Sequence, residues 1–465
     1  MRTSVVSVVL FTADLRLHDH PPLRAALDGA SAVVPLFVRD PAVDAAGFAV
    51  PNRLAFLADC LRDLDAGLRE RGGRLVVRSG DLVEEVCRVA VEADAGEVHM
   101  AADVSAHARR REDRLRAALE AAGRRLLVHD AVTTVLAPGA VTPGGRDHFA
   151  VFSPYFRRWS EQRVRPVLDA PRSVPVPEGI GSREPPARRE LSGLSPGLAP
   201  GGEREGRTRL AAWLREGVGD GGAVGEYEDR HDDLAGDATS RLSPHLHFGT
   251  LSPVEVVHGA RNLGGPGAEA FVRQLAWRDF HRQVLAARPA AAHADYRTRH
   301  DRWRTAEAAR DEVEAWREGR TGYPVVDAAM RQLRHEGWMH NRGRLLTASF
   351  LAKTLYVDWR VGARHFLDLL VDGDLANNQM NWQWVAGTGT DSRPNRVLNP
   401  VVQGKRFDPE GGYVRRWVPE LAEVPGTGVH EPWKLRGRAR EAARGYAERV
   451  IDLAEGLERF RRARA

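Results

Sequence analysis

The first 130 residues alternate short apolar runs with amphipathic stretches. The clearest amphipathic stretch carries an apolar residue every three or four positions and ends before Gly72-Gly73, as a helix does. A more basic helix is expected over 109–122. The stripe of the helix that ends before Gly72-Gly73 consists of Leu54, Leu57, Leu61, Leu64 and Leu68. The apolar runs predict strands at 5–10, 32–38, 75–77, 97–101 and 126–128.

Alternating strands and helices predict a doubly wound parallel sheet. Pro35 would fall inside the second strand, where a residue without an N–H group is awkward. The stretch after the first strand lacks the Gly-x-Gly-x-x-Gly pattern, so the sequence does not support a standard dinucleotide site there.

Proline, glycine and charged residues dominate the stretch that follows, and beyond it helical patterns replace the strands. We therefore predict an α/β domain over 1–132, an interdomain linker over 133–206 and an all-α domain over 207–465. The apolar start of the chain is too short to span a membrane.

Composition excludes several classes of protein. Hydrophobic content of 43% and charged content of 28% are typical of a globular protein. A net charge of +5 is compatible with a local nucleic-acid surface without requiring one. Two cysteines, Cys60 and Cys87, are too few for a disulfide framework or an iron–sulfur cluster and indicate a cytosolic protein. His245 and His247 are expected to flank a turn, and no metal site is predicted.

Residues 372–384 hold two acids, five side-chain amides and two tryptophans. Trp382 and Trp384, two positions apart on a helix, cannot both serve one packing stripe. Buried acids and amides must also find hydrogen-bond partners. The stretch is therefore either a binding site or a polar helix start followed by core tryptophans.

Three further stretches suggest binding. Thr239, Ser240, Arg241 and Ser243 offer hydroxyls and a cation to an anion, although helix capping alone would also explain the hydroxyls. Gln274, Trp277, Arg278 and His281 share one helix face, a mixture that suits a pocket wall. Arg342 and Arg344 cannot both face one way, so one can serve a phosphate and the other an internal acid, Asp372 or Asp374.

Seven segments in the same order resemble the photolyase/cryptochrome family, and within it bacterial class I cyclobutane pyrimidine dimer photolyases. The resemblance runs from about residue 2 to about residue 420. It is carried by Asp14-Leu-Arg16, Thr239-Ser-Arg-Leu-Ser243, Trp277-Arg-Asp-Phe280, Gly322-Tyr-Pro324, Trp338-Met-His-Asn-Arg342, Asp358-Trp-Arg360 and Asn378 to Trp384.

The resemblance implies FAD in the helical domain. Arg344 and Asp372 would pair across the flavin ring, with Asp374 at its polar edge and Asn378 beside N5. Phe271 stands where the family usually has tryptophan. The residues implied around the phosphates are Tyr227, Thr239, Ser240, Arg241, Leu242 and Ser243.

The resemblance also implies a chain of tryptophans that carries electrons to the flavin. Trp382, Trp359 and Trp303 match this chain, and Trp316 is the alternative to Trp303 because the spacing between them is longer than usual.

A flipped-out lesion would lie between Trp277 and Trp384, and Asn341 and Arg342 would contact lesion and phosphate. Gln274 stands where dimer photolyases usually carry Glu, and Leu345 where Met is common. The other implied DNA contacts are Arg278, Arg396 and Lys405.

The implied function is light-driven repair, in which reduced FAD excited by blue light donates an electron to a cyclobutane pyrimidine dimer and splits it. The alternatives are a blue-light-sensing cryptochrome and repair of (6-4) photoproducts. Gln274 is typical of (6-4) enzymes, but those usually show a His pair where this chain has His340-Asn341.

An antenna chromophore would occupy the first domain. 8-Hydroxy-5-deazaflavin is the first expectation and methenyltetrahydrofolate the alternative, with Arg53 and Asp103 as guessed contacts. The implied partner is UV-damaged DNA, single- or double-stranded. We expect a cytoplasmic, nucleoid-associated bacterial monomer without membrane attachment.

Overall fold

The computed structural model describes residues 5–215 and 222–464. The chain forms two compact units, each built from several separate segments. Unit 1 comprises residues 1–194, 199–228 and 240–289, and unit 2 comprises 195–198, 229–239 and 290–465. Each unit is described by itself.

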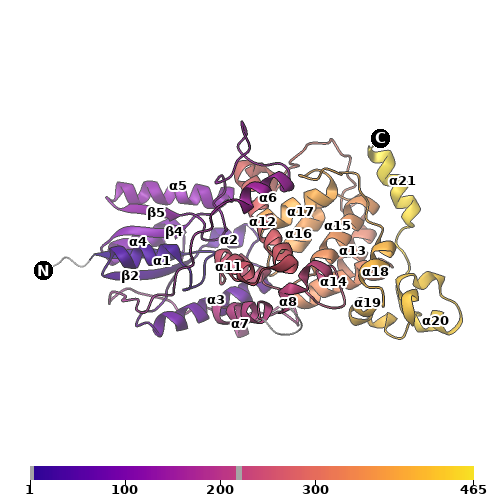
Figure 1. Cartoon of the computed structure of the whole chain (residues 1–465), viewed down its shortest axis with the longest axis horizontal. Coiled ribbons are helices and arrows are strands. Elements are labelled where there is room, and N and C mark those ends of the chain that lie inside the picture. Colours follow the sequence, from indigo (N-terminus) through magenta and orange to yellow (C-terminus); the bar gives the residue numbers. More distant parts are fainter. Residues whose placement is uncertain (1–4, 216–221, 465) are drawn as a thin grey trace. The chain divides into compact units, whose positions relative to one another are not determined.

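Unit 1 contains a five-stranded, all-parallel sheet in the order β3-β2-β1-β4-β5 (Figure 1). Each strand lies within one to two residues of the apolar run that predicted it, because runs buried on both faces are the pattern of parallel strands. The strands are β1 Val6–Phe11, β2 Ala32–Arg39, β3 Val76–Ser79, β4 Ala95–Ala101 and β5 Arg125–His129.

Pro35 does lie inside an interior strand. It is opposite Val9 of β1, whereas the ladder to β3 begins only at Leu36. Its missing N–H group therefore costs no hydrogen bond to β3. Two residues before Pro35, the N–H group of Val33 donates to the carbonyl of Pro175 at 2.8 Å. The segment that contains Pro175 therefore covers this side of β2.

The helices of unit 1 follow the expected alternation through the sheet. Both helices predicted from periodicity form, as α3 and α5. The helices are α1 Pro21–Gly29, α2 Pro41–Ala45, α3 Pro51–Arg69, α4 Leu82–Glu92, α5 Ala106–Ala121, α6 Phe152–Ser160, η1 Arg188–Glu190, α7 Glu203–Trp213, α8 Gly222–Gly225, α10 Ser243–Phe248, α11 Pro253–Leu263 and α12 Gly265–Ala287. Two short helices span unit boundaries, α9 Tyr227–Arg230 and η2 Pro289–Ala292.

Helices α4 and α5 pack on the sheet through one apolar cluster. Val86 and Val89 of α4 and Leu115 and Leu119 of α5 are fully buried with the inward residues of the strands. Burying such side chains is worth roughly 1.5–3 kcal/mol each, so this cluster contributes to the stability of the sheet.

The loop after β1 is fixed by a buried arginine. The Arg16 guanidinium donates to the carbonyls of Gly249 at 3.0 Å and Val132 at 2.9 Å. Gly249 has φ 66° and its Cα lies against Ala13, where a Cβ would come within 2.0 Å of the Ala13 oxygen. Both contacts hold the segment around α10 close to the carboxyl end of β1.

The expectation of a plain linker over 133–206 is corrected by α6 and its contacts. Asp279 of α12 accepts hydrogen bonds from the N–H groups of Val135 at 3.1 Å and Leu136 at 3.0 Å and from the Trp159 indole at 3.0 Å. Tyr155 and Trp159 of α6 are buried. Aromatic side chains, not overall apolar content, anchor this segment. The domain boundaries themselves stay a prediction.

Unit 2 is helical, and within its described residues the β pairing is limited to one isolated bridge between Arg304 and Val357. Its apolar core centres on α14, α15, α16 and α17. The helices are α13 Arg310–Glu318, α14 Pro324–Glu336, α15 Asn341–Ser349, the π-helix η3 Phe350–Thr354, α16 Trp359–Leu369, α17 Leu375–Ala386, α18 Pro400–Phe407, α19 Gly412–Trp417, η4 Pro419–Leu421, η5 Gly426–His430, η6 Pro432–Lys434, α20 Gly437–Ala442 and α21 Leu453–Arg464.

The predicted fold class is confirmed: a parallel α/β sheet precedes a helical carboxy-terminal region. The expected turn at His245 and His247 is wrong, since both lie inside α10. Across residues 5–215 and 222–464, no group of histidine, cysteine and acidic side chains is arranged to hold a metal ion. The same residues include no helix with the length and apolar character needed to cross a bilayer.

Candidate functional site

An ion pair between α15 and the loop before α17 is the first feature of unit 2. Arg344 Nη2 donates to Asp372 Oδ2 at 2.8 Å, and Arg344 Nε donates to the Met339 carbonyl at 2.8 Å. The Asp372 side chain is only 3% exposed. Its second oxygen, Oδ1, is buried and has no hydrogen-bond partner among the described residues. A buried acceptor without a partner is costly in a finished core and suits a site that a ligand completes.

Asp374 begins α17 as its N-cap. Its carboxylate accepts from the backbone N–H of Asn377 at 2.9 Å and from the Asn377 amide at 2.9 Å. The next amide, Asn378, donates to the Ala363 carbonyl of α16 at 3.0 Å. The first turn of α17 is thus held in place by its own polar side chains.

The glutamines of α17 anchor its other side. Gln379 donates to the Ala292 carbonyl at 2.6 Å, and Gln383 donates to the Ala291 carbonyl at 2.7 Å while accepting from the Tyr296 N–H at 2.7 Å. These amides satisfy the buried backbone of residues 291–296. The glutamine amides of α17 therefore have a structural role, because they hold residues 291–296 against the helix.

The three tryptophans predicted to form the electron-transfer chain all lie in unit 2. Trp382 is buried against Gly362, where a Cβ would lie 2.1 Å from the indole, so only glycine admits the ring so close to α16. Trp359 is fully buried and donates to Asp295 at 2.9 Å. Trp303 is partly exposed. The alternative, Trp316, contacts Trp382 edge-on with centroids 6.1 Å apart but is fully buried, which favours Trp303 as the surface end.

The two arginines of α15 both pair with internal acids. Arg344 pairs with Asp372, one of the two acids expected, whereas Arg342 pairs with Asp232, with Nε 3.1 Å from Oδ1. The Arg342 guanidinium also lies 4.2 Å from the centre of the Phe407 ring. Asp232 was missed because it is more than a hundred residues away and carries no motif.

The residue before α15 is a buried, neutral histidine. Burial lowers the pKa of His340 to about 4, so the ring is uncharged near neutral pH. Its Nδ1 accepts from the Arg342 N–H at 3.1 Å, and its Nε2 is buried without a partner in the described chain. Asn341 beside it is exposed, as a residue that contacts DNA must be.

The other residues of unit 2 predicted to contact DNA differ in environment. Trp384 and Leu345 are half-buried at the edge of the apolar core. Arg396 is exposed. Lys405 is exposed but forms an ion pair with Glu431. A phosphate would have to compete with that carboxylate for Lys405.

In unit 1, Trp277 of α12 lies flat on Phe152 of α6. The ring centroids are 3.7 Å apart and the planes differ by 8°, so one face of Trp277 is covered. The Arg273 guanidinium lies over the Phe152 ring, 5.2 Å from its centroid. Gln274, one turn earlier, is exposed. Phe152 was missed because its segment was assigned to a linker.

The four residues predicted to form a pocket face on α12 differ in their exposure to solvent. Arg278 donates to the backbone carbonyls of Thr133 and, at 2.8 Å, Leu246, and His281 is buried. Arg278 therefore ties α12 to two neighbouring segments of unit 1, a role that the sequence did not reveal. Gln274 and Trp277 remain the members of this face that a ligand can reach.

Two residues predicted to contact FAD in unit 1 lie together. Phe271 and Tyr227 meet edge-on with centroids 5.5 Å apart, and Trp213 contacts both. The alternative of side-chain capping at α10 is wrong, since the N-cap is Leu242 and no side chain caps it. Arg241 has φ 51°, a left-handed conformation that is uncommon for arginine. Ser240 and Ser243 flank it and are partly exposed.

Unit 1 also has a cavity of about 460 Å³ at the carboxyl ends of β4 and β5. Asp103 and Arg109 line it with Asp130 and Thr133. Ligands of doubly wound sheets bind at this edge. Arg53, the other guessed antenna contact, is buried and donates to the Phe48 carbonyl at 2.8 Å.

Comparison with known proteins agrees with this arrangement. Residues 7–177 match a family model described as DNA photolyase, and residues 271–465 match one described as FAD binding domain of DNA photolyase. A curated relative, the deoxyribodipyrimidine photo-lyase of Streptomyces griseus, is 67% identical over 460 residues, which is 99% of each chain.

The solved structures that resemble this chain are also photolyases and a cryptochrome. A class III photolyase from Agrobacterium tumefaciens superposes with a TM-score of 0.91 at 30% identity, covering 100% of this chain and 98% of the other. A Synechocystis cryptochrome gives 0.90 at 29% identity with 100% of both chains covered. A Sulfolobus tokodaii photolyase that holds two FAD molecules gives 0.83 at 30% identity with 99% of both covered.

Proposed function

Because this chain belongs to the DNA photolyase family, we propose that it uses blue light to split cyclobutane pyrimidine dimers in UV-damaged DNA back to monomers. It is an enzyme and a flavoprotein lyase. The observation that carries the proposal is the Asp372 carboxylate, which pairs with Arg344 through one oxygen and keeps the other buried and open.

The residues of unit 2 fit FAD. Arg344 would favour a negatively charged isoalloxazine, the open Asp372 oxygen would accept a hydrogen bond, and Asn378 would offer a neutral amide. Thr239 has a buried hydroxyl without a partner among the described residues, as a phosphate contact would. Bound, reduced and excited by blue light, FAD supplies the electron that opens the dimer. Asp374 and, in unit 1, Tyr227, Ser240, Arg241, Leu242, Ser243 and Phe271 stay predicted contacts.

Trp382, Trp359 and Trp303 form the path that delivers electrons inward. The Asp295 carboxylate beside the Trp359 indole stabilises positive charge on that ring, so a hole can rest there during transfer. Trp303 at the partly exposed end exchanges electrons with reductants in solution. Gly362 keeps Trp382 against the first turn of α16, the helix that begins with Trp359.

The lesion is held by stacking and by polar contacts. Phe152 backs one face of Trp277 and so fixes the ring, which is only partly buried and could receive a base. Stacking on Trp277 supplies about 1–3 kcal/mol per base, comparable with the few kcal/mol that flipping costs, and Trp384 stays a predicted stacking contact. Gln274 and Asn341 are exposed and offer amides to pyrimidine carbonyls. Contacts from Arg278, Arg342, Leu345, Arg396 and Lys405 stay predictions, and those to phosphates would weaken with salt.

We propose that the antenna chromophore binds at the 460 Å³ cavity of unit 1, beside Asp103. 8-Hydroxy-5-deazaflavin is our first proposal and methenyltetrahydrofolate the second. The Sulfolobus tokodaii structure, with its two FAD molecules, adds FAD as a third chemistry to test. We further propose a cytoplasmic, nucleoid-associated monomer that accepts dimers in single- or double-stranded DNA.

The test is repair of a defined thymine-dimer oligonucleotide by dithionite-reduced protein under blue light, beside a (6-4) oligonucleotide. Loss of the dimer is expected. Loss of only the (6-4) lesion would reassign the pocket, which Gln274 makes worth testing. Repair of neither lesion by a protein that holds photoreducible FAD would favour a light sensor, as in the cryptochrome that shares this fold.

A further inference from the structure

Trp303 has a tyrosine neighbour packed against its ring. The ring centroids of Trp303 and Tyr356 are 4.7 Å apart with planes inclined by 31°. Backbone hydrogen bonds fix the two segments to each other, since Arg304 donates to the Tyr356 carbonyl at 3.0 Å and Asp358 donates to the Arg304 carbonyl at 3.1 Å. Trp359 and Trp382 have no such contact with tyrosine within the described residues. An electron can pass between rings this close without an intermediate.

The two rings differ in where their protons can go. The Tyr356 hydroxyl donates to Asp301 Oδ1 at 3.0 Å. The Trp303 indole N–H is buried and meets no acceptor in the part of the chain that the structure describes. An oxidised phenol is a strong acid and loses its proton to any carboxylate that it touches. An oxidised Trp303 has no base in place and must keep its charge.

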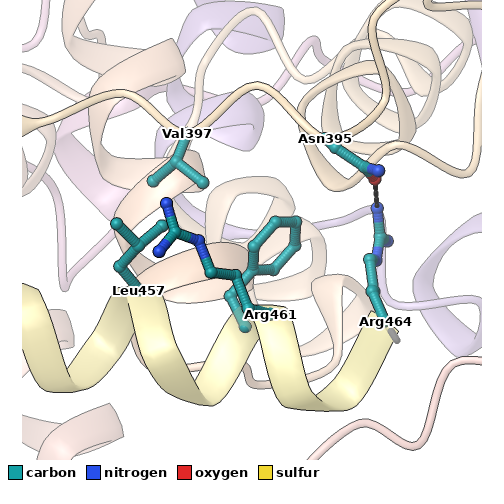
Figure 2. A pocket seen from close by; sticks show the side chains of 6 residues that line it. Asn395, Val397, Leu457, Arg461 and Arg464 are labelled. Carbon is teal, nitrogen blue, oxygen red and sulfur yellow. Dashed lines mark hydrogen bonds between the residues drawn. The ribbon is translucent and has the colours of Figure 1, made fainter.

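An arginine of the last helix, Arg464, makes a positive charge on Trp303 unfavourable. Arg464 of α21 pairs with both oxygens of Asp301, Nη2 to Oδ2 at 2.9 Å and Nε to Oδ1 at 3.0 Å, and its guanidinium lies 5.7 Å from the centre of the Trp303 ring. Figure 2 shows Arg464 reaching from α21 to Asn395, beside a cavity of about 380 Å³ that Phe460 also lines. Like charges repel, so the positive charge on Arg464 opposes a second one on Trp303.

Tyr356 is held in place at the expense of backbone strain. Its φ is 56°, which is rare for an aromatic residue, and it follows the π-helix η3. Such conformations persist where the surroundings impose them, and they cluster at functional sites. The residue is buried, with 2% exposure, and Asp301, Trp303 and the Phe460 ring contact its side chain.

We propose that Tyr356 is an electron donor beyond Trp303, with Asp301 as its proton acceptor. The proposal rests on the proposed function, because the tryptophan chain supplies the oxidant. One electron passes from the Tyr356 ring to the Trp303 radical cation, and the phenolic proton passes to Asp301 Oδ1. The products are neutral Trp303, a neutral Tyr356 phenoxyl radical and a protonated Asp301 carboxyl. The positive charge leaves the indole beside Arg464, so return of the electron from within the protein is slowed.

The test is electron paramagnetic resonance of FAD-loaded protein, frozen under blue light, made with ring-deuterated tyrosine or with ordinary tyrosine. A tyrosyl spectrum that narrows on deuteration and disappears in Tyr356→Phe is expected. A second arm oxidises the same proteins with a photoexcited ruthenium tris-bipyridine and an electron scavenger, which does not depend on the flavin. Asp301→Asn, which keeps the Tyr356 ring, should also abolish the tyrosyl signal.

Tyr446→Phe is the matched control, because Tyr446 is likewise buried and donates to a buried acid, Asp327, but no tryptophan ring contacts it in the described chain. It should leave the tyrosyl signal unchanged. A tryptophan spectrum in the wild-type protein, or a tyrosyl spectrum that survives Tyr356→Phe, in the ruthenium arm would overturn the proposal. Signal in the ruthenium arm without any under blue light would uphold Tyr356 while the tryptophan path from FAD fails.

Discussion

Replacing Arg344 with methionine would leave the Asp372 carboxylate buried without its partner. The Asp372 side chain is 3% exposed and that of Arg344 is 25% exposed, with 2.8 Å between nitrogen and oxygen. Removing one member of a buried pair costs about 3–5 kcal/mol, because the remaining charge keeps its desolvation penalty. Since Arg344 is partly exposed, we expect Arg344→Met to lower the free energy of unfolding by about 3 kcal/mol.

Arg364→Met is a matched control. Arg364 and Asp368, on α16, pair at the same 2.8 Å but are 56% and 41% exposed. An exposed pair four residues apart contributes about 0.3–0.5 kcal/mol, because water and salt screen it. The two substitutions remove the same side chain at the same ion-pair distance, so the difference between them reports burial together with the hydrogen bond from Arg344 to the Met339 carbonyl.

Urea unfolding of the FAD-free proteins, followed by tryptophan fluorescence, measures both losses. The double variant Arg344→Met/Asp372→Asn should recover part of the stability, since it removes the isolated charge as well. FAD retention on gel filtration should fall for Arg344→Met and not for Arg364→Met. Equal losses of stability in the two single variants would refute the argument that burial gives the pair its value.

Three further expectations concern the tryptophans and one lysine. Trp382→Phe should abolish photoreduction of bound FAD while dithionite-reduced protein still repairs a dimer; loss of both activities would contradict the assignment of Trp382 to electron transfer. Trp277→Ala should weaken binding of a dimer-containing oligonucleotide by about 1–3 kcal/mol, and equal weakening for undamaged DNA in a gel-shift assay would argue against stacking on the lesion. Burial lowers the pKa of Lys353 to about 7, so between pH 7 and 10 the unfolded chain binds more protons than the folded one and stability rises with pH. A rise of roughly 2 kcal/mol between pH 7.5 and 9.5 in urea midpoints should be absent in Lys353→Met, and an unchanged rise would show that another group is responsible.

The sheet of unit 1 could be predicted because its evidence is local. Each buried strand is a short apolar run, and the stripe from Leu54 to Leu68 repeats with a helical period. Helix α6 escaped because its nine residues lie just before a proline-rich stretch and were assigned with it to the linker, and because Asp279, which anchors its Trp159, is 120 residues away. Local periodicity carries no information on such a partner.

Some contacts of the candidate site could likewise be predicted from the sequence and others could not. The pair between Arg344 and Asp372 followed from the resemblance and from the need of a buried arginine for an acid. The partner of Arg342, Asp232, and the ring behind Trp277, Phe152, did not, because neither sits in a motif. Pairs of opposite charge or of aromatic rings can form in many combinations, and only the folded chain selects among them.

The way the two compact units share the chain has a consequence for synthesis on the ribosome. Unit 1 needs residues 240–289 as well as 1–194, and unit 2 draws on residues 195–198 and 229–239 long before its main segment begins. A nascent chain that has passed residue 194 therefore still lacks α11 and α12. Asp279 of α12 accepts the hydrogen bonds that hold the backbone of Val135 and Leu136. Neither unit can be completed as a simple amino-terminal block, so fragments cut near residue 200 should be poor substitutes for the whole protein.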